Sequence, residues 1–161
     1  MKISTTALTG TAVAMGLGFA VLTSASATPT TDRLTTLDFA VQFRPLMENY
    51  VDLGAAWFSV GDLLVFQDTL LDQKGATVGT QGGACTITAV LPDGFQTHCV
   101  GTASLPDGQI SFQGLTSNAP VKPLAFTGGT CTYQAATGDL FLTENGDDTG
   151  TLRIRLNRGH R

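Results

Sequence analysis

The stretch from Leu124 to Leu142, LAFTGGTCTYQAATGDLFL, constrains the fold of this chain more than any other segment. It reads as two strands separated by Gly128-Gly129, a short segment around Tyr133, and Gly138. A hairpin loop usually takes about two to five residues, whereas about eight separate these strands. Glycines accept the left-handed backbone conformations that such a corner needs. A corner of this kind is unusual in a β-sandwich, so it predicts a barrel.

The N-terminal segment has the three parts of a secretory signal peptide. Lys2 supplies the positive charge, residues 12–22 (AVAMGLGFAVL) form an apolar region, and Ala25-Ser26-Ala27 fits the small-residue cleavage rule. The apolar region is too short to span a bilayer, which disfavours the alternative of a membrane anchor. We therefore predict cleavage after Ala27, a flexible tail over residues 28–34, one domain over residues 35–161, and a secreted protein.

Charge and composition exclude several classes of partner. The formal net charge is −4 and becomes one unit more negative when Lys2 is removed, which argues against binding to nucleic acid or to an anionic membrane. Arg153 and Arg155 alternate with apolar residues, so we expect them on the solvent face of the last strand. No segment of the mature chain is apolar enough to cross a membrane. Two histidines and three cysteines without a CxxC spacing predict no metal site.

The rest of the chain has a β pattern without sustained helical periodicity. The two turns at residues 91–94 and 105–108 share the sequence Leu-Pro-Asp-Gly and predict a three-strand meander. Gly82-Gly83 predicts a bulge or bend in a long strand, and residues 46–57 look like a long connection. The expected strands span residues 37–43, 62–71, 76–90, 95–105, 109–115, 123–127, 139–144 and 150–156.

These elements predict an all-β domain, either a closed barrel or a sandwich. The long strands and glycine kinks favour an eight-stranded antiparallel β-barrel. A barrel of that size either fills its lumen with side chains or holds one small ligand.

The cysteines predict one disulfide, since an exported protein meets oxidising conditions. Cys85 and Cys99 lie at similar distances on either side of the turn at residues 91–94. In an antiparallel pair they face one another on adjacent strands, within bridging distance if both point to the same face. We favour Cys85–Cys99, with Cys131 outside the bridge. The alternative is that Cys131 captures Cys99.

Three side chains are candidates for a lumen site. Asp68 shares one strand face with Leu64 and Phe66. If that face points inward, burial raises the pKa of Asp68 and makes it a candidate acid or anchor. Alternatively, Asp68 lies in water at the barrel rim or pairs with an arginine. Phe66 is either a platform for a ligand or a core residue, and Tyr133 either faces the lumen or plugs the corner.

Short motifs recur along the chain in the order and at spacings similar to those of one known family. They are Gly61-Asp62-Leu63, Phe66, residues 74–79 (KGATVG), residues 83–85 (GAC), residues 108–110 (GQI), Gln113-Gly114, residues 126–129 (FTGG) and Gly138. On these residues the sequence resembles the allene oxide cyclase and dirigent-protein barrel family over residues 61–144.

The resemblance implies an eight-stranded antiparallel barrel whose apolar lumen binds a hydrophobic small molecule. It implies catalysis by confinement in a cyclase or isomerase, or a stereo-directing role as in dirigent proteins, without a cofactor. It also implies a homodimer or homotrimer formed through the barrel exterior.

The resemblance also assigns individual positions. Phe66 and Cys85 match lumen residues of the plant cyclases, and Asp68 matches a lumen amide that holds a water. Ala40 stands where those cyclases carry a first-strand glutamate, and Gln42 takes a neighbouring polar position. Without that carboxylate the main electrostatic contributor is missing, so plant-type cyclase activity is not expected.

The sequence thus predicts a secreted barrel that binds a small hydrophobic molecule in its lumen. The candidate lumen residues are Gln42, Phe66, Asp68 and Tyr133, with Asp68 as the candidate catalytic group. The alternative is a non-enzymatic structural or interaction barrel at the cell surface. An apolar lumen favours the first hypothesis, while a filled lumen with an apolar outer face favours the second.

Overall fold

The computed structural model describes residues 34–44 and 49–158. The predicted signal peptide, its cleavage after Ala27 and the tail up to residue 33 lie outside these residues. The elements in chain order are β1 (Leu34–Gln42), β2 (Tyr50–Val51), β3 (Leu63–Leu71), β4 (Thr77–Leu91), β5 (Gly94–Leu105), β6 (Gly108–Ser117), β7 (Val121–Gly129), the short 3₁₀ helix η2 (Cys131–Tyr133), β8 (Ala136–Glu144) and β9 (Thr149–Arg158). Across this described part of the chain, no helix has the length and apolar character needed to cross a bilayer.

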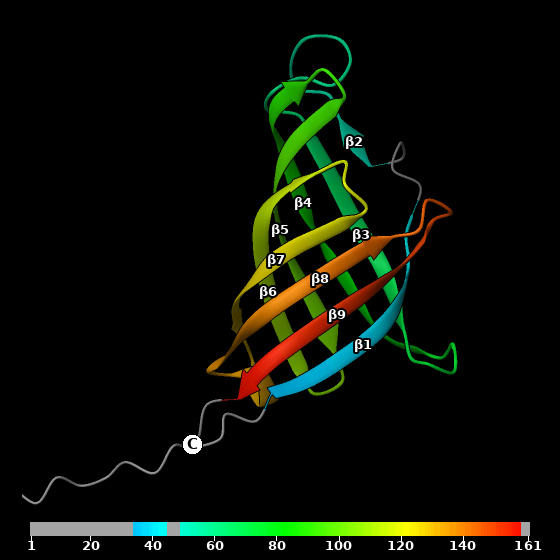
Figure 1. The fold of residues 1–161 in the computed structure, drawn as a ribbon, viewed down its shortest axis with the longest axis vertical. Coiled ribbons are helices and arrows are strands. Elements are labelled where there is room, and N and C mark those ends of the chain that lie inside the picture. Colours follow the sequence, from blue (N-terminus) through cyan, green and yellow to red (C-terminus); the bar gives the residue numbers. More distant parts are fainter. Residues whose placement is uncertain (1–33, 45–48, 159–161) are drawn as a thin grey trace, which may run out of the picture. The chain divides into compact units, whose positions relative to one another are not determined.

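Eight of the strands close into an antiparallel barrel. Each strand from β3 to β9 pairs with the next, and β1 pairs with both β9 and β3. Figure 1 shows β1 beside β9 across the front of the barrel. Strand β2 pairs only with β3 and lies within the segment expected as a plain connection. The predicted eight-stranded antiparallel barrel is confirmed.

The two Pro-Asp-Gly turns form as predicted. Pro92-Asp93 joins β4 to β5 and Pro106-Asp107 joins β5 to β6. A bulge at Gly82-Gly83 is wrong, because the pairing of β4 with β3 and β5 runs through both glycines without a register shift, while the alternative of a bend there stays a prediction. The register shifts lie instead at Leu70/Leu71 and at Ile87/Ala89.

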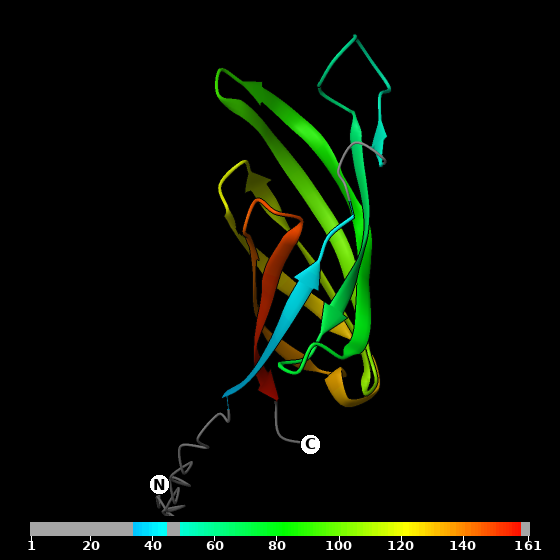
Figure 2. The same cartoon turned by 90° about the vertical axis from the view of Figure 1, so that its right-hand side faces the viewer.

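Alternating side chains fill one end of the barrel. The inward positions carry mostly leucine, isoleucine and alanine side chains, because successive residues of a strand point to opposite faces. The fully buried ones include Leu70, Ala103, Ile110, Leu140, Ile154 and Leu156. Figures 1 and 2 place η2 at this end of the barrel, the same end at which β1 starts, and Tyr133 of η2 joins the core. One end of the lumen is therefore a packed core.

The corner between β7 and β8 exists, and of its glycines Gly138 takes the expected positive φ angle (157°). Strand β7 continues through Gly129, and the other positive φ angles of this segment occur at Cys131 (51°) and Ala135 (62°). A Cβ at Gly129 would lie 2.7 Å from the Cβ of Tyr133. Glycine is needed there because η2 folds closely against the strand.

A second pair of glycines makes room for two aromatic rings. Gly83 on β4 and Gly101 on β5 are register partners. A Cβ at Gly101 would lie 2.6 Å from Cζ of Phe112 and 3.0 Å from Cζ of Phe66. The two rings therefore pack directly over backbone, which fixes where they stand in the lumen.

Cys85 on β4 and Cys99 on β5 are also register partners, and they form a disulfide. The favoured pairing is confirmed, and the alternative pairing of Cys99 with Cys131 is wrong. The reason is topological, since β4 and β5 are adjacent whereas Cys131 lies in η2. The side chain of Cys131 is exposed.

The packing of the rings predicts that Gly101→Ala is destabilising. The added methyl group meets the Phe112 ring at sub-van-der-Waals distance, so we expect the free energy of unfolding to fall by about 1–3 kcal/mol. Gly128→Ala is the matched control, because a Cβ at Gly128 meets no atom within 4 Å. Chemical denaturation of the two variants tests this, and equal losses of stability would contradict it.

The disulfide predicts a second stability effect. Replacing both Cys85 and Cys99 by alanine frees a loop with a sequence separation of 14 residues, and we expect a loss of about 2–4 kcal/mol. Dithiothreitol should lower the melting temperature of the native protein and leave that of the double variant unchanged. A native protein insensitive to the reductant, with a double variant of native stability, would show that the bridge contributes nothing.

Candidate functional site

A cavity of about 310 Å³ occupies the lumen above the packed core. Strand β1 begins at the η2 end, and Phe43, which follows it, lies at the cavity. The lining residues are Phe43, Arg44, Leu64, Val65, Phe66, Asp68, Gln81, Cys85, Cys99, Phe112, Thr116, Lys122, Leu124, Leu142, Glu144, Gly146 and Asp148. The lumen is thus packed at one end and hollow at the other.

The walls of the cavity are mostly apolar. Three phenylalanine rings, those of Phe43, Phe66 and Phe112, contribute to them. The disulfide forms another part of the wall, with the hydroxyl groups of Thr97 and Thr116 near the sulfur of Cys99, at 3.5 and 3.4 Å. These two hydroxyl groups also bond each other at 2.7 Å, which satisfies their polar atoms. Such a surface suits a hydrophobic and aromatic molecule.

Two buried polar side chains lie in this apolar cavity. Asp68 on β3 and Gln81 on β4 are register partners, exposed by 5% and 1% respectively. Nε2 of Gln81 donates a hydrogen bond of 3.0 Å to Oδ2 of Asp68. Burial raises the pKa of Asp68 above its ordinary value, although hydrogen bonds from Gln81 and from the backbone of Arg44 act in the opposite direction. The cavity therefore holds a carboxyl group biased toward its protonated form.

Charged side chains lie near the Asp68–Gln81 pair, on the side away from the packed core. Nζ of Lys122 lies 2.7 Å from Oε2 of Glu144 and also donates to the carbonyl of Ala119 at 3.1 Å. The negative charge of Glu144 adds to the upward shift of the Asp68 pKa, while the positive charge of Arg44 opposes it. An apolar chamber thus lies between a packed core and a charged rim.

The structure brings some of the predicted site residues together. Phe66, Asp68, Cys85 and Cys99 all line the same cavity. Asp68 does not lie in water at the rim, because its side chain is buried. Its carboxylate accepts from an amide of the adjacent strand. The role of these four lining residues toward a ligand stays a prediction.

Two other predicted lumen residues are misplaced. Gln42 is exposed, because its neighbour Val41 takes the inward position. Tyr133 is 3% exposed within the core at the η2 end and does not line the cavity. The prediction that Tyr133 plugs the corner describes its position better than the lumen alternative.

The face assigned to Ala40 is also wrong. Ala40 is exposed on the outer side of β1, whereas Phe39 and Val41 point inward. A one-residue shift along a strand exchanges the two faces. Both inward positions are apolar, so the inner face of β1 carries no carboxylate here.

Sequence reasoning missed Gln81, Phe43 and Phe112 as cavity residues. The alternation of inward and outward residues along the strand could have identified Gln81, because it shares a face with Gly83 and Cys85. The bulge or bend expected at Gly82-Gly83 would interrupt this alternation before Gln81. Phe112 carried no signal of its own, since its position depends on the glycine pair of β4 and β5.

A second buried carboxylate lies beside the barrel mouth and differs sharply from Asp68. Asp62 accepts hydrogen bonds from the hydroxyl of Tyr50 at 2.5 Å and from the amides of Leu53 and Ser59 at 2.9 and 2.6 Å. These bonds, of which the one from Tyr50 has the largest effect, lower the pKa of Asp62 to about 2. Burial and the same carboxylate raise the pKa of Tyr50 to about 12. Asp62 therefore holds the loop between β2 and β3 in place and has no role in the cavity.

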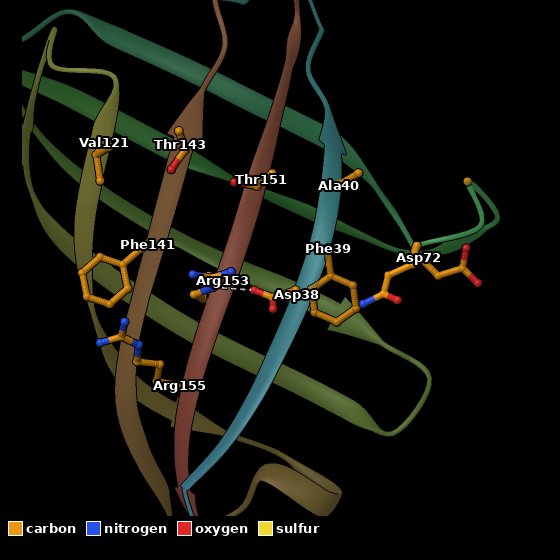
Figure 3. A pocket seen from close by; sticks show the side chains of 12 residues that line it. Asp38, Phe39, Ala40, Asp72, Val121, Phe141, Thr143, Thr151, Arg153 and Arg155 are labelled. Atoms are coloured by element: carbon orange, nitrogen blue, oxygen red, sulfur yellow. Dashed lines mark hydrogen bonds and ion pairs between the residues drawn. The ribbon is translucent and has the colours of Figure 1, made fainter.

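A larger hollow of about 730 Å³ lies on the outer side of the barrel (Figure 3). Its charged side chains already have partners. Nε of Arg153 lies 2.7 Å from Oδ1 of Asp38, and the guanidinium of Arg155 lies 5.0 Å from the centre of the Phe141 ring. Both arginines are exposed, as the alternation of the last strand predicts. This hollow is a solvated sheet face, and the lumen cavity is the better candidate site.

Within residues 34–44 and 49–158, no three histidine, cysteine, aspartate or glutamate side chains are grouped closely enough to hold a metal ion. The described cavity offers an apolar surface, the buried carboxyl and amide groups of Asp68 and Gln81, and charged side chains such as Lys122 and Glu144.

The raised pKa of Asp68 predicts a pH-dependent stability difference. The folded state binds the proton more tightly than the unfolded chain, so ionisation of Asp68 costs stability as the pH rises above its ordinary value of 3.8. Asp68→Asn removes this cost. We expect the melting temperature of the variant relative to the native protein to rise by a few degrees between pH 4 and pH 8. A difference that stays constant over this range would contradict the assignment.

Comparison with known proteins agrees with this geometry. Residues 47–156 match the family described as Allene oxide cyclase barrel like domain. No curated protein matches the chain in sequence. Among solved structures, a pyocyanin demethylase is 31% identical with a TM-score of 0.69, over 76% of this chain and 100% of that one.

Two further structures share the fold at lower identity. A pterocarpan synthase dirigent protein is 17% identical with a TM-score of 0.63, over 86% of this chain and 99% of that one. A Diels-Alderase from Streptomyces koyangensis is 15% identical with a TM-score of 0.62, over 78% of this chain and 64% of that one. The family match and the 31% identical structure carry the assignment. This chain belongs to the allene oxide cyclase barrel like family.

Proposed function

We propose that this protein binds a small, apolar and largely aromatic molecule in the lumen cavity. The observation that carries the proposal is a cavity of about 310 Å³ with phenylalanine walls and one buried carboxyl–amide pair. Ligand sites of about 300–1,000 Å³ are typically apolar with a few placed polar groups, which fix the orientation of the ligand. The cavity has this composition.

We propose further that the bound molecule is converted by confinement, as in an isomerase or cyclase. The walls restrict the ligand to few conformations, which brings reacting atoms together. Asp68 is the candidate general acid, because a raised pKa leaves a larger fraction of the carboxyl group protonated at a given pH and so able to donate a proton. The inner face of β1 is apolar, so Asp68 takes the place of a first-strand acid in this proposal.

The relatives support a role in small-molecule chemistry. Their names describe demethylation of pyocyanin, pterocarpan synthesis by a dirigent protein, and a Diels-Alder reaction. At 31% identity, the first makes pyocyanin a reasonable first probe for this cavity. Export from the cell is part of the proposal, and the disulfide between Cys85 and Cys99 supports it, because disulfides persist in oxidising compartments.

Binding in the lumen is tested by filling the cavity. Leu142 lines it from β8, so Leu142→Trp should abolish binding of pyocyanin and of 2-naphthol in isothermal titration calorimetry. Ala125→Trp adds the same side chain at an exposed position of the neighbouring strand β7 and should leave both affinities unchanged. Circular dichroism and melting curves establish that both variants are folded.

Two outcomes would contradict the proposal. Equal affinities in the two tryptophan variants would place the ligand outside the lumen. Absence of binding in the native protein would favour the alternative of a surface interaction barrel. A row of exposed apolar side chains, Val65, Val100 and Leu115, lies on the outer side of β3, β5 and β6 and would then be the surface to examine.

A further inference from the structure

One buried polar atom in the cavity is not accounted for by the fold. Oε1 of Gln81 is buried and has no hydrogen-bond partner among the described residues, although Nε2 of the same amide donates to Asp68. Gln81 as a whole is 1% exposed and lines the cavity. Buried acceptors nearly always have a donor, so an unpaired one indicates a donor from outside the described residues.

The orientation of the amide follows from its partner. Oδ2 of Asp68 accepts from Nε2 of Gln81, and the two residues face each other across β3 and β4. A carboxyl group keeps an acceptor oxygen whether or not it is protonated, and Oδ2 of Asp68 takes this role toward the NH₂ group of Gln81. Asp68 therefore holds the amide so that Oε1 is the atom left for the cavity.

We propose that the ligand carries an N–H or O–H group at its buried end, and that Oε1 of Gln81 accepts its hydrogen bond. This inference rests on the proposed function and specifies the class of ligand. The ligand is a compact aromatic molecule with one donor, such as a phenol or an aromatic amine. Phe66 and Phe112 contact its rings, and Gln81 sets its orientation and specificity.

A matched pair of probes separates this proposal from simple hydrophobic binding. 2-Naphthol and 2-methylnaphthalene have nearly the same shape, but only the first has a donor. 2-Methoxynaphthalene has an acceptor and no donor. We expect the native protein to bind 2-naphthol roughly tenfold more tightly than either other probe, since a buried acceptor that stays unpaired weakens binding by about that factor.

Gln81→Met removes the acceptor while keeping a side chain of similar length. The preference for 2-naphthol should fall to roughly twofold or less in this variant, because the methionine offers no comparable acceptor. Gln113→Met is the matched control, since Gln113 is an exposed glutamine on β6. This control variant should keep the full preference. Titration calorimetry gives the dissociation constants, and melting curves establish folding.

The outcomes distinguish this inference from the proposed function. Binding of all three probes without preference would overturn the inference, with a bound water as the donor to Gln81, and would leave lumen binding intact. Tighter binding of 2-methoxynaphthalene would overturn it in favour of the opposite amide orientation. A preference that survives Gln81→Met would assign the recognition to another residue. No binding of any probe to the native protein would overturn the proposed function itself. If Gln81→Met does not fold, absence of a preference in the native protein still overturns the inference.

Discussion

The pairing of β1 with two strands is the constraint on which the lumen depends. β1 runs along β9 over its whole length, while its last three residues pair with Thr69–Leu71 of β3. This short second pairing removes the open edge of the sheet and turns one face of every strand into an interior. Side chains on that face must then either fill the space or enclose a cavity. In this barrel they fill the space at the η2 end and enclose a cavity at the other end.

Much of the barrel could be predicted from local signals. The period-two pattern and the Pro-Asp-Gly turns place the strands, and similar distances from one turn place Cys85 close to opposite Cys99. The failures have a common cause, since a pattern does not tell which face of a strand points inward. Gln42 and Ala40 were assigned to the inner face by resemblance, and a shift of one residue reverses that assignment. A pair such as Gly82-Gly83 is typical of a bend, but glycine is equally required where a side chain packs closely against the backbone.

Asp62 and Asp68 show why the chemistry of the site was harder to predict than the fold. Both are buried carboxylates near or on β3, yet their pKa values move in opposite directions. Asp62 receives bonds from Tyr50 of β2 and from the loop that follows, whereas burial in an apolar chamber outweighs the bond that Gln81 donates to Asp68. The difference arises from burial and from partners on other elements, so neither residue reveals its state in its own strand.

The disulfide has a consequence for the lumen cavity. Neighbouring strands of a barrel separate transiently, and a hollow chamber tends to collapse because its apolar walls gain contacts by closing. Cys85–Cys99 lies in the wall and joins β4 to β5 covalently at this height. This disulfide keeps one side of the chamber in its open form, so a ligand binds to a surface that is already formed. Association then loses less conformational entropy than it would in a chamber that must first be opened.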